Sequence, residues 1–484
     1  MRGPIDGLLQ EAASVYRLVQ FIERFCVEQK ASRSYVPATS RFLGMARLLA
    51  DRTKRHLQET AAEGVRRAAA KSSFTDTWLN NERDSLHTIK CEWTILHRYL
   101  KPAADAHALQ VPFSLVTLAE RQLRSLEQMG GALIAVLVTP ELNYFQRSHT
   151  SLKNTICTLG EATGQKDIPT GLVGFVELPF SQGPSLFSNV LMYHELGHFI
   201  LAERTAVAGA LRKAASDSLS QVYGKELTAN PKSDQFFTRM LENWAFEIFC
   251  DLFAIRLIGP AFTFASVEMF GLVGVLAGDT PERFVQSHPA PACRFQQQLA
   301  MLKDDGWWQS VALLDSDRRV QIERLAEVPK DRYWLSLDGK RAQRTDILAA
   351  FDTLLGTVWK CVREVTNDPS DARQCFADES ADVQACLAEG VVPSRLFSAR
   401  PLSLAMPVAI INAAFCFYLS EQLPSLITAL ADQDATDLEH RSYWIKRLEM
   451  WTVKAIEDFF LLEGAQQYGR STTGGTAIKT VKGS

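Results

Sequence analysis

The sequence lacks the signatures of several common protein classes. Its nine cysteines form no Cys-x-x-Cys pair, which argues against a thiolate zinc site and a disulfide framework. The formal net charge is only -3, and no basic stripe gives an electrostatic reason to expect nucleic acid as a partner. The first residues do not form the apolar core of a signal peptide. We therefore expect a cytoplasmic protein that keeps its cysteines reduced.

Long hydrophobic runs are also scarce. Residues 401–420 carry no charge and residues 261–278 carry only Glu268, but the first run contains Pro401, Pro407 and Asn412. A membrane-spanning helix needs about 20 mostly apolar residues, and neither run has a clear basic flank on one side. We expect two buried helices and no stable insertion into a membrane.

The remaining sequence is rich in apolar residues at helical spacing. Two continuous apolar runs, 132–138 and 171–180, instead predict buried strands. The fold class expected is α+β, mostly α-helical. The expected parts are an N-terminal helical region at 1–128, a core at 129–300, a C-terminal helical region at 301–465 and a disordered tail at 466–484.

One stretch carries a known chemical pattern. His194-Glu195-Leu196-Gly197-His198 has the form His-Glu-x-x-His, and its flanks are apolar nearly all round, as in a buried helix. On a helix His194 and His198 face the same side, so both can bind one zinc ion, and Glu195 can act as general base on the water that the metal holds. The alternative is a core helix whose histidines form ordinary hydrogen bonds.

A catalytic zinc site needs a third protein ligand and one open position. Glu247 and Asp251 lie four residues apart in a largely apolar helical run, 234–257. Carboxylates in such surroundings are costly unless they bind a cation or a donor. We expect Glu247 to bind zinc and Asp251 to accept the outer N–H of a zinc-bound imidazole. Alternatively, both pair with an arginine or lie at a solvated edge.

A third segment adds a histidine and an arginine. His288 precedes Pro289, which favours an extended backbone that could aim the ring into a cleft. There His288 could donate to the oxyanion of a tetrahedral intermediate, while Arg294 adds positive charge or binds a carboxylate. The alternative for His288 is an ordinary loop histidine in water.

Taken in order, these segments resemble the gluzincin peptidases, and within them the group of CAAX prenyl proteases, HtpX-type heat-shock proteases and soluble minigluzincins. The matching residues are His194-Glu195-Leu196-Gly197-His198, Glu247-x-x-x-Asp251-x-x-Ala254, and His288-Pro289 with Arg294. The resemblance covers roughly residues 130–300. It implies a zincin-like core with a small mixed sheet and Zn²⁺ on His194, His198 and Glu247. It also implies that Glu195 is the base, that Asp251 orients a histidine and that His288 steadies the oxyanion.

Two departures limit the resemblance. Phe246 precedes Glu247, where thermolysin-like relatives have asparagine, and the membrane helices of the prenyl proteases are not evident, which favours the soluble branch. The sequence thus predicts a soluble zinc endopeptidase whose protein or peptide substrate lies antiparallel to the strand at 171–180. The helical flanks could bind a protein partner or cover the cleft of a latent enzyme. The alternative is a catalytically inactive, zinc-stabilised scaffold or regulatory interaction protein.

Overall fold

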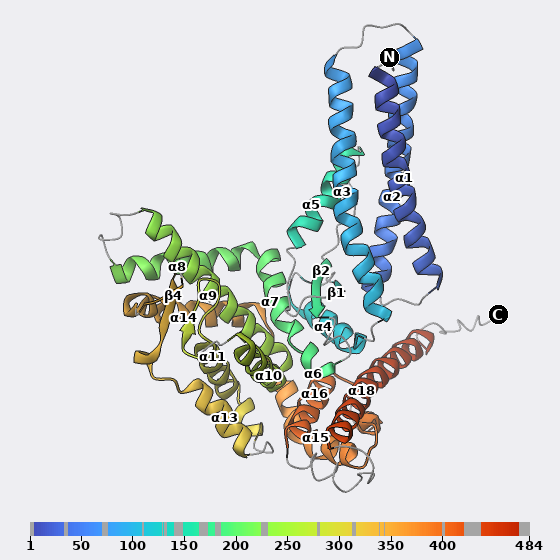
Figure 1. The fold of residues 1–484 in the computed structure, drawn as a ribbon. Coiled ribbons are helices and arrows are strands. Elements are labelled where there is room, and N and C mark those ends of the chain that lie inside the picture. Colours follow the sequence, from blue (N-terminus) through green and yellow to red (C-terminus); the bar gives the residue numbers. More distant parts are fainter. Residues whose placement is uncertain are drawn as a thin grey trace, which may run out of the picture. The chain divides into compact units, whose positions relative to one another are not determined.

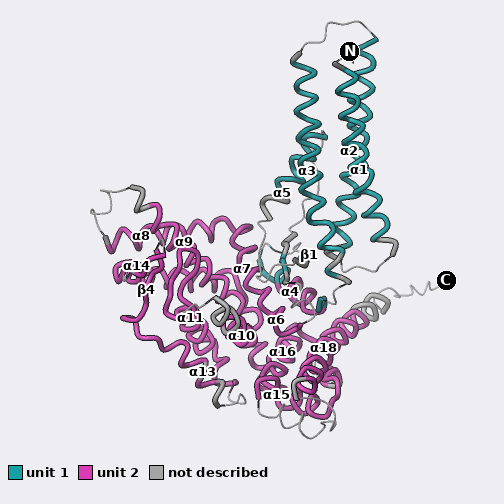
Figure 2. Tube along the Cα trace, viewed as in Figure 1, with its two compact units in different colours: residues 1–113, 123–184 teal, residues 114–122, 185–484 magenta. Residues whose placement is uncertain are grey.

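The structure is a computed structural model that describes residues 4–32, 37–69, 76–108, 111–127, 129, 133–139, 149–163, 173–179, 185–223, 231–277, 281–311, 316–337, 339–342, 344–398, 402–420 and 437–473. These residues are mostly helical, with one sheet of two strands and one of three (Figure 1), which confirms the expected α+β class. The chain divides into two compact units (Figure 2). Unit 1 contains residues 1–113 and 123–184, and unit 2 contains residues 114–122 and 185–484.

Unit 1 is built on three long helices, α1 (Pro4–Ser32), α2 (Pro37–Ala69) and α3 (Asp76–Ala108). Apolar residues recur at helical spacing on each, and α1 packs against both α2 and α3 through them. A buried hydrogen bond of 3.2 Å from Trp93 Nε1 to Thr53 Oγ1 adds a polar contact between α3 and α2. These three helices confirm that the described N-terminal residues are helical, as expected.

The two apolar runs form the expected strands, β1 (Leu133–Thr139) and β2 (Val173–Pro179). They pair in parallel, with Leu133 opposite Val173, and helix α5 (His149–Ala162) lies between them in sequence. A parallel pair needs a crossover connection of this kind. Both strands belong to unit 1. The expectation that a substrate lies along the strand at 171–180, beside the metal, therefore stays a prediction.

Unit 2 is organised around the central helix α9 (Pro231–Ile258), which contacts α7 (Met192–Glu203), α8 (Thr205–Tyr223), α10 (Pro260–Ala277) and α11 (Pro291–Asp304). Helix α9 is apolar on most sides because it is enclosed by these neighbours. It ends at Ile258, and the φ of 73° at the following residue, Gly259, allows the sharp turn into α10.

A small mixed sheet holds the segment before His288. Strand β3 (Arg283–Phe284) pairs in parallel with β4 (Trp334–Leu337), and β4 pairs antiparallel with β5 (Lys340–Ala342). Phe284 is buried against Trp244 of α9, with ring centroids 4.5 Å apart, and Trp244 Nε1 donates a 2.7 Å hydrogen bond to the carbonyl of Val285. The sheet thus anchors the His288 segment to α9.

The later part of unit 2 is helical. Its described elements are α12 (Trp307–Ser310), α13 (Ser316–Ala326), η4 (Lys330–Arg332), α14 (Thr345–Val365), α15 (Ser370–Ala388), η5 (Pro393–Ser398), α16 (Ala405–Tyr418) and α18 (Asp437–Thr473). Helix α18 continues past residue 466, where the tail was expected to begin, and residues 474–484 lie outside the described part. The expected division at 128 and 300 stays a prediction.

The two apolar runs form helices, as expected, within α10 and α16. Helix α16 is buried along nearly its whole length, and residues 261–266 of α10 are buried. In the described residues, neither these nor any other helix combines the length and hydrophobicity required to cross a membrane. Asn412 of α16 is fully buried, and its Nδ2 donates to the carbonyl of Ile258 while its Oδ1 accepts from the N–H of Ala261, at 2.8 and 2.7 Å. Asn412 therefore satisfies backbone groups left open at the α9–α10 junction.

Helix α18 also secures the approach to the His-Glu-x-x-His helix. The short helix α6 (Leu186–Asn189) precedes α7, and Ser185 is its N-cap residue. Glu449 of α18 accepts hydrogen bonds from Ser185 Oγ at 2.6 Å and from the N–H of Phe187 at 3.2 Å. Burial raises the pKa of Glu449, and these donors partly oppose that rise. The C-terminal helix thus fixes the segment that leads into α7.

Candidate metal centre

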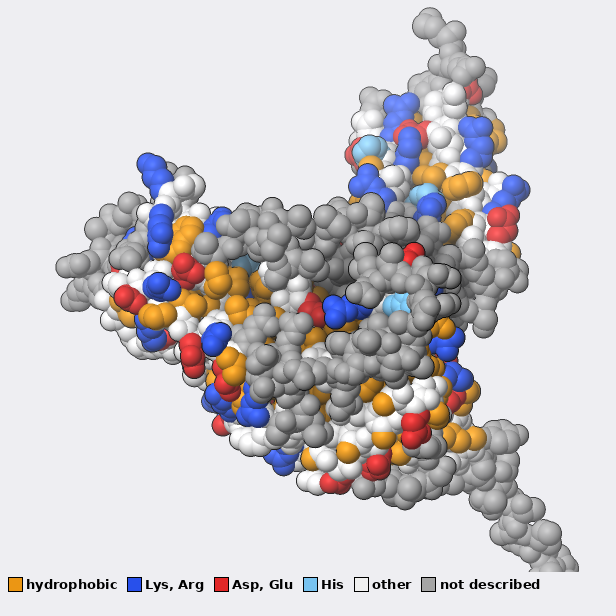
Figure 3. All heavy atoms as spheres, turned by 60° about the horizontal axis from the view of Figure 1, so that its bottom comes forward, with side chains coloured by type: hydrophobic (Ala, Val, Ile, Leu, Met, Phe, Trp, Pro, Cys, Tyr) orange, Lys and Arg blue, Asp and Glu red, His pale blue; other side chains and the backbone are white. Residues whose placement is uncertain are grey.

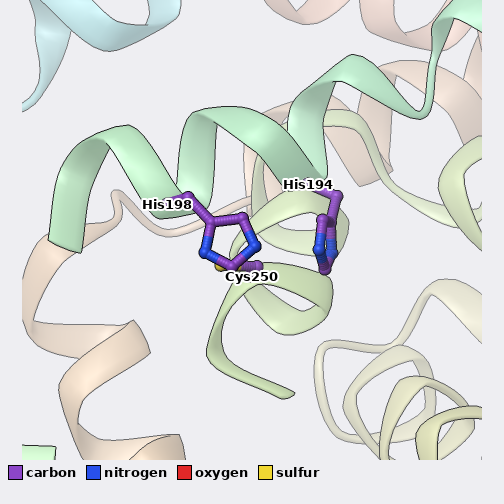
Figure 4. A group of neighbouring side chains, drawn as sticks. All are labelled: His194, His198 and Cys250. Carbon is purple, nitrogen blue, oxygen red and sulfur yellow. The ribbon is translucent and has the colours of Figure 1, made fainter. Parts of the chain in front are cut away.

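Helix α7 presents two imidazoles on one side. The rings of His194 and His198 have centroids 4.9 Å apart and are inclined at 82° to each other. Both project from α7 towards α9 (Figure 4), as their spacing of four residues predicts. Their side chains are only 12% and 23% exposed, so both sit in a sheltered site rather than in bulk water.

The close approach of α7 to α9 depends on Gly197. A Cβ atom at this position would lie 2.7 Å from Cys250 Cα and 2.9 Å from its Sγ, closer than packed carbon and sulfur atoms tolerate. Glycine therefore lets the two helix backbones touch at the level of the histidines. Without that approach the side chains of α9 would not reach the imidazoles.

Glu247 of α9 faces both histidines. Its Oε2 lies 3.4 Å from His194 Nε2, and its Oε1 lies 3.4 Å from His198 Nε2. Two ligands bound tetrahedrally to one zinc ion at about 2.0–2.1 Å are themselves roughly 3.4 Å apart. The three side chains expected to bind zinc are thus brought together at distances that suit a cation between them.

Among the residues that the structure describes, the buried Oε2 atom of Glu247 has no hydrogen-bond partner. It lies 3.3 Å from Arg294 Nη1 and 3.6 Å from His288 Nε2, in addition to the contact with His194. A buried carboxylate oxygen without a hydrogen bond is costly, and a bound cation would remove that cost. This atom is the clearest sign in the site that the residues fit a metal ion.

The balance of the buried charges also favours a bound cation. The carboxyl groups of Glu195, Glu247 and Asp251 are all buried, and Arg294 is the buried guanidinium beside them. If ionised, these four side chains carry a net charge of -2 beside neutral imidazoles, which a divalent cation would balance. Burial lowers the pKa of His194, but the neighbouring carboxylates of Asp251 and Glu247 outweigh burial and raise the pKa to about 10. The two carboxylates around the His194 ring thus favour a positive charge on it or beside it.

Asp251 orients His194. Its side chain is fully buried, and Oδ1 lies 2.8 Å from His194 Nδ1. Arg294 binds both oxygens, with Nη2 2.6 Å from Oδ1 and Nε 2.7 Å from Oδ2. Burial raises the pKa of Asp251, but Arg294 outweighs it and brings the pKa to about 2. An ionised Asp251 accepts the Nδ1 proton, which leaves Nε2, the ring atom that faces Glu247, as the atom that could coordinate a metal ion.

The remaining expected residues lie around the same point. His288 approaches Glu247 from the loop after β3, with half of its side chain exposed, and its Nδ1 lies 2.7 Å from Ser287 Oγ. Burial of the ring lowers the pKa of His288. Glu195 is buried next to His194 on α7. Arg294, expected either to add positive charge or to bind a carboxylate, binds the carboxylate of Asp251.

Two residues near the site were not anticipated from the sequence. Gln298 of α11 is fully buried and donates from Nε2 to Asp251 Oδ2 at 3.1 Å. Cys250 offers its Sγ within 4.8 Å of nitrogen atoms of His194 and His198 (Figure 4), so these three also form a possible metal-binding group. Burial and then the nearby carboxylates raise the pKa of the Cys250 thiol. Zinc deprotonates a thiol that it binds, so Cys250 is the alternative to Glu247 as the third ligand.

Replacing Gly197 with alanine tests the contact between α7 and α9. The added methyl group would force the helices apart, so we expect the free energy of unfolding to fall by about 1–3 kcal/mol. Zinc should also bind more weakly, because Glu247 moves away from the histidines. Urea unfolding and zinc titration measure both effects. In Gly209→Ala on α8 the new methyl group meets no atom within 4 Å, so stability should not fall there. Equal behaviour of the two variants would contradict the packing argument.

The described surface is mixed in charge. On the face shown in Figure 3, lysine and arginine side chains are interspersed with aspartate and glutamate, in line with the formal net charge of -3. No model of a protein family, no curated protein and no solved structure matches the chain. The roles of the clustered residues are therefore inferred from their own geometry.

Proposed function

We propose that this chain is a soluble, cytoplasmic zinc-dependent endopeptidase of the gluzincin type. The observation that carries the proposal is the position of Glu247, whose two oxygens each lie 3.4 Å from a different imidazole of the His-Glu-x-x-His helix. Two imidazoles and a carboxylate are the ligand set of one class of catalytic zinc site, in which a fourth position stays open.

His194, His198 and Glu247 would hold the ion. When bound, zinc would polarise the scissile carbonyl group and make water a better nucleophile near neutral pH. Asp251 holds His194 in the tautomer whose Nε2 is free to coordinate, and Arg294 holds Asp251 in place through two hydrogen bonds.

Glu195 would move the proton. It follows His194 directly on α7 and is sheltered from bulk water, which suits a carboxylate that accepts a proton from the attacking water and passes it to the leaving nitrogen. His288 is the half-exposed donor at the edge of the site. An N–H on its ring would stabilise the oxyanion that develops on the substrate carbonyl.

Metal removal tests this function. The chain, loaded with zinc, is incubated with a mixture of unrelated proteins, and the new N-termini are identified by mass spectrometry. We expect about one zinc ion per chain and new termini that disappear after treatment with a chelator and return when zinc is added back. A chain that binds zinc tightly, melts when zinc is removed and yet produces no new termini would instead support the zinc-stabilised scaffold.

A further inference from the structure

Helix α11 carries three consecutive glutamines that have different surroundings. Gln296 is exposed, and Gln297 accepts a 2.9 Å hydrogen bond from Trp359 Nε1 at its Oε1. Gln298 is fully buried and points the other way, with Nε2 3.1 Å from Asp251 Oδ2. It lies four residues after Arg294, so both side chains reach Asp251 from the same face of α11.

We propose that Gln298 is a positioning residue for the metal site, an inference that rests on the proposed function. It holds the Oδ2 oxygen of Asp251, so that the Oδ1 oxygen stays directed at His194 Nδ1. Through Asp251, Gln298 fixes the direction in which His194 Nε2 points.

The hydrogen bonds of Asp251 show what Gln298 adds to the contact with Arg294. Oδ1 interacts with His194 Nδ1 and Arg294 Nη2, and Oδ2 with Arg294 Nε and Gln298 Nε2. Each oxygen thus has two partners, and the carboxylate plane is defined from both sides. Without Gln298, Arg294 still binds both oxygens, but Oδ2 loses one of its two donors and the carboxylate is held less tightly. The ring of His194 would then be less well oriented.

The buried amide of Gln298 also lowers the stability of the folded protein. Its Oε1 is buried and has no hydrogen-bond partner among the described residues. A buried polar atom left without a partner lowers stability, and an apolar side chain of the same length would avoid the loss. Turning the amide over would not help, because Oε1 would then face the carboxylate of Asp251. The amide is therefore best explained by what its Nε2 does for Asp251.

The test compares zinc affinities of the full-length chain, measured by competition with a chromophoric chelator. Gln298→Met keeps the length of the side chain and removes the donor. We expect zinc to bind roughly 3–10-fold more weakly, less than the 10–100-fold typical for the direct partner of a ligand. The metal-free variant should unfold at the same temperature as the wild type or higher, because the unpartnered oxygen is gone. Gln297→Met is the matched control and should bind zinc as the wild type does.

A second variant covers the case in which Gln298→Met does not fold. Gln298→Glu places a carboxylate against Asp251 Oδ2, and we expect a larger loss of zinc affinity and a changed visible spectrum of the cobalt-substituted protein. Zinc affinity and cobalt spectrum equal to the wild type in both folded variants, or in Gln298→Glu alone, would overturn the proposal. If the wild type itself does not bind zinc, the proposed function fails together with this inference. Zinc binding without peptidase activity would contradict only the proposed function.

Discussion

Replacing Glu195 with glutamine is expected to lower the rate of peptide-bond cleavage by about 10²–10⁴-fold, the range by which a positioned general base contributes to catalysis. Glutamine has nearly the shape of glutamate but cannot accept the proton of the attacking water. Since Glu195 is not one of the three proposed ligands, zinc content should remain that of the wild type. The measurement is the initial rate of cleavage of a substrate found in the proteomic search, together with elemental analysis of the same preparation.

Glu203→Gln provides the control. Glu203 is the last residue of the same helix α7 and lies eight residues after Glu195, so the substitution makes the same chemical change away from the histidines. We expect its cleavage rate to match the wild type. Cleavage at the wild-type rate by Glu195→Gln, with zinc bound, would exclude Glu195 as the base and end the proposed mechanism.

The second large effect is expected for Glu247→Ala. Loss of a direct zinc ligand should weaken zinc binding by more than the roughly 10–100-fold that follows from loss of a hydrogen-bond partner behind a ligand. Binding to the folded state stabilises a protein in proportion to the logarithm of ligand concentration over Kd. Wild-type protein should therefore melt at a higher temperature when zinc is added, and the variant should gain much less. Without zinc the variant should be less stable than the wild type, because removing Glu247 breaks its ion pairs with His194, His198 and Arg294. The comparison therefore uses the rise in melting temperature that zinc causes in each protein.

Glu242→Ala on the same helix α9 controls for general effects on that helix, since Glu242 is partly exposed and lies five residues before Glu247. It should leave zinc binding unchanged. A Glu247→Ala protein that keeps wild-type zinc affinity would show that Glu247 is not a ligand. Cobalt substitution then identifies the alternative, because a Cys250 thiolate would add a sulfur-to-cobalt charge-transfer band that Cys250→Ser abolishes.

The sequence by itself determined the local parts of the site. A spacing of four residues places His194 and His198 on one face of any α-helix, and the same holds for Glu247 and Asp251, because the helix repeats every 3.6 residues. The apolar surroundings of both pairs predicted that their helices are buried, and the structure has them buried. The apolar runs that form β1 and β2, and the nearly uncharged runs that form α10 and α16, were likewise predictable from period and composition.

Tertiary structure decided which of these local faces meet. Nothing in the order of residues states that Gly197 lies against Cys250, yet this contact sets the distance from Glu247 to the histidines. Gln298 is one of three adjacent glutamines, and only packing selects it as the partner of Asp251. In the sequence Cys250 is an ordinary cysteine in an apolar helix, and it becomes a possible metal ligand only because α7 packs beside it. Hydrophobic periodicity shows which face of a segment is buried. It does not show which other segment covers that face, because contacts between side chains distant in sequence depend on how whole helices are packed together.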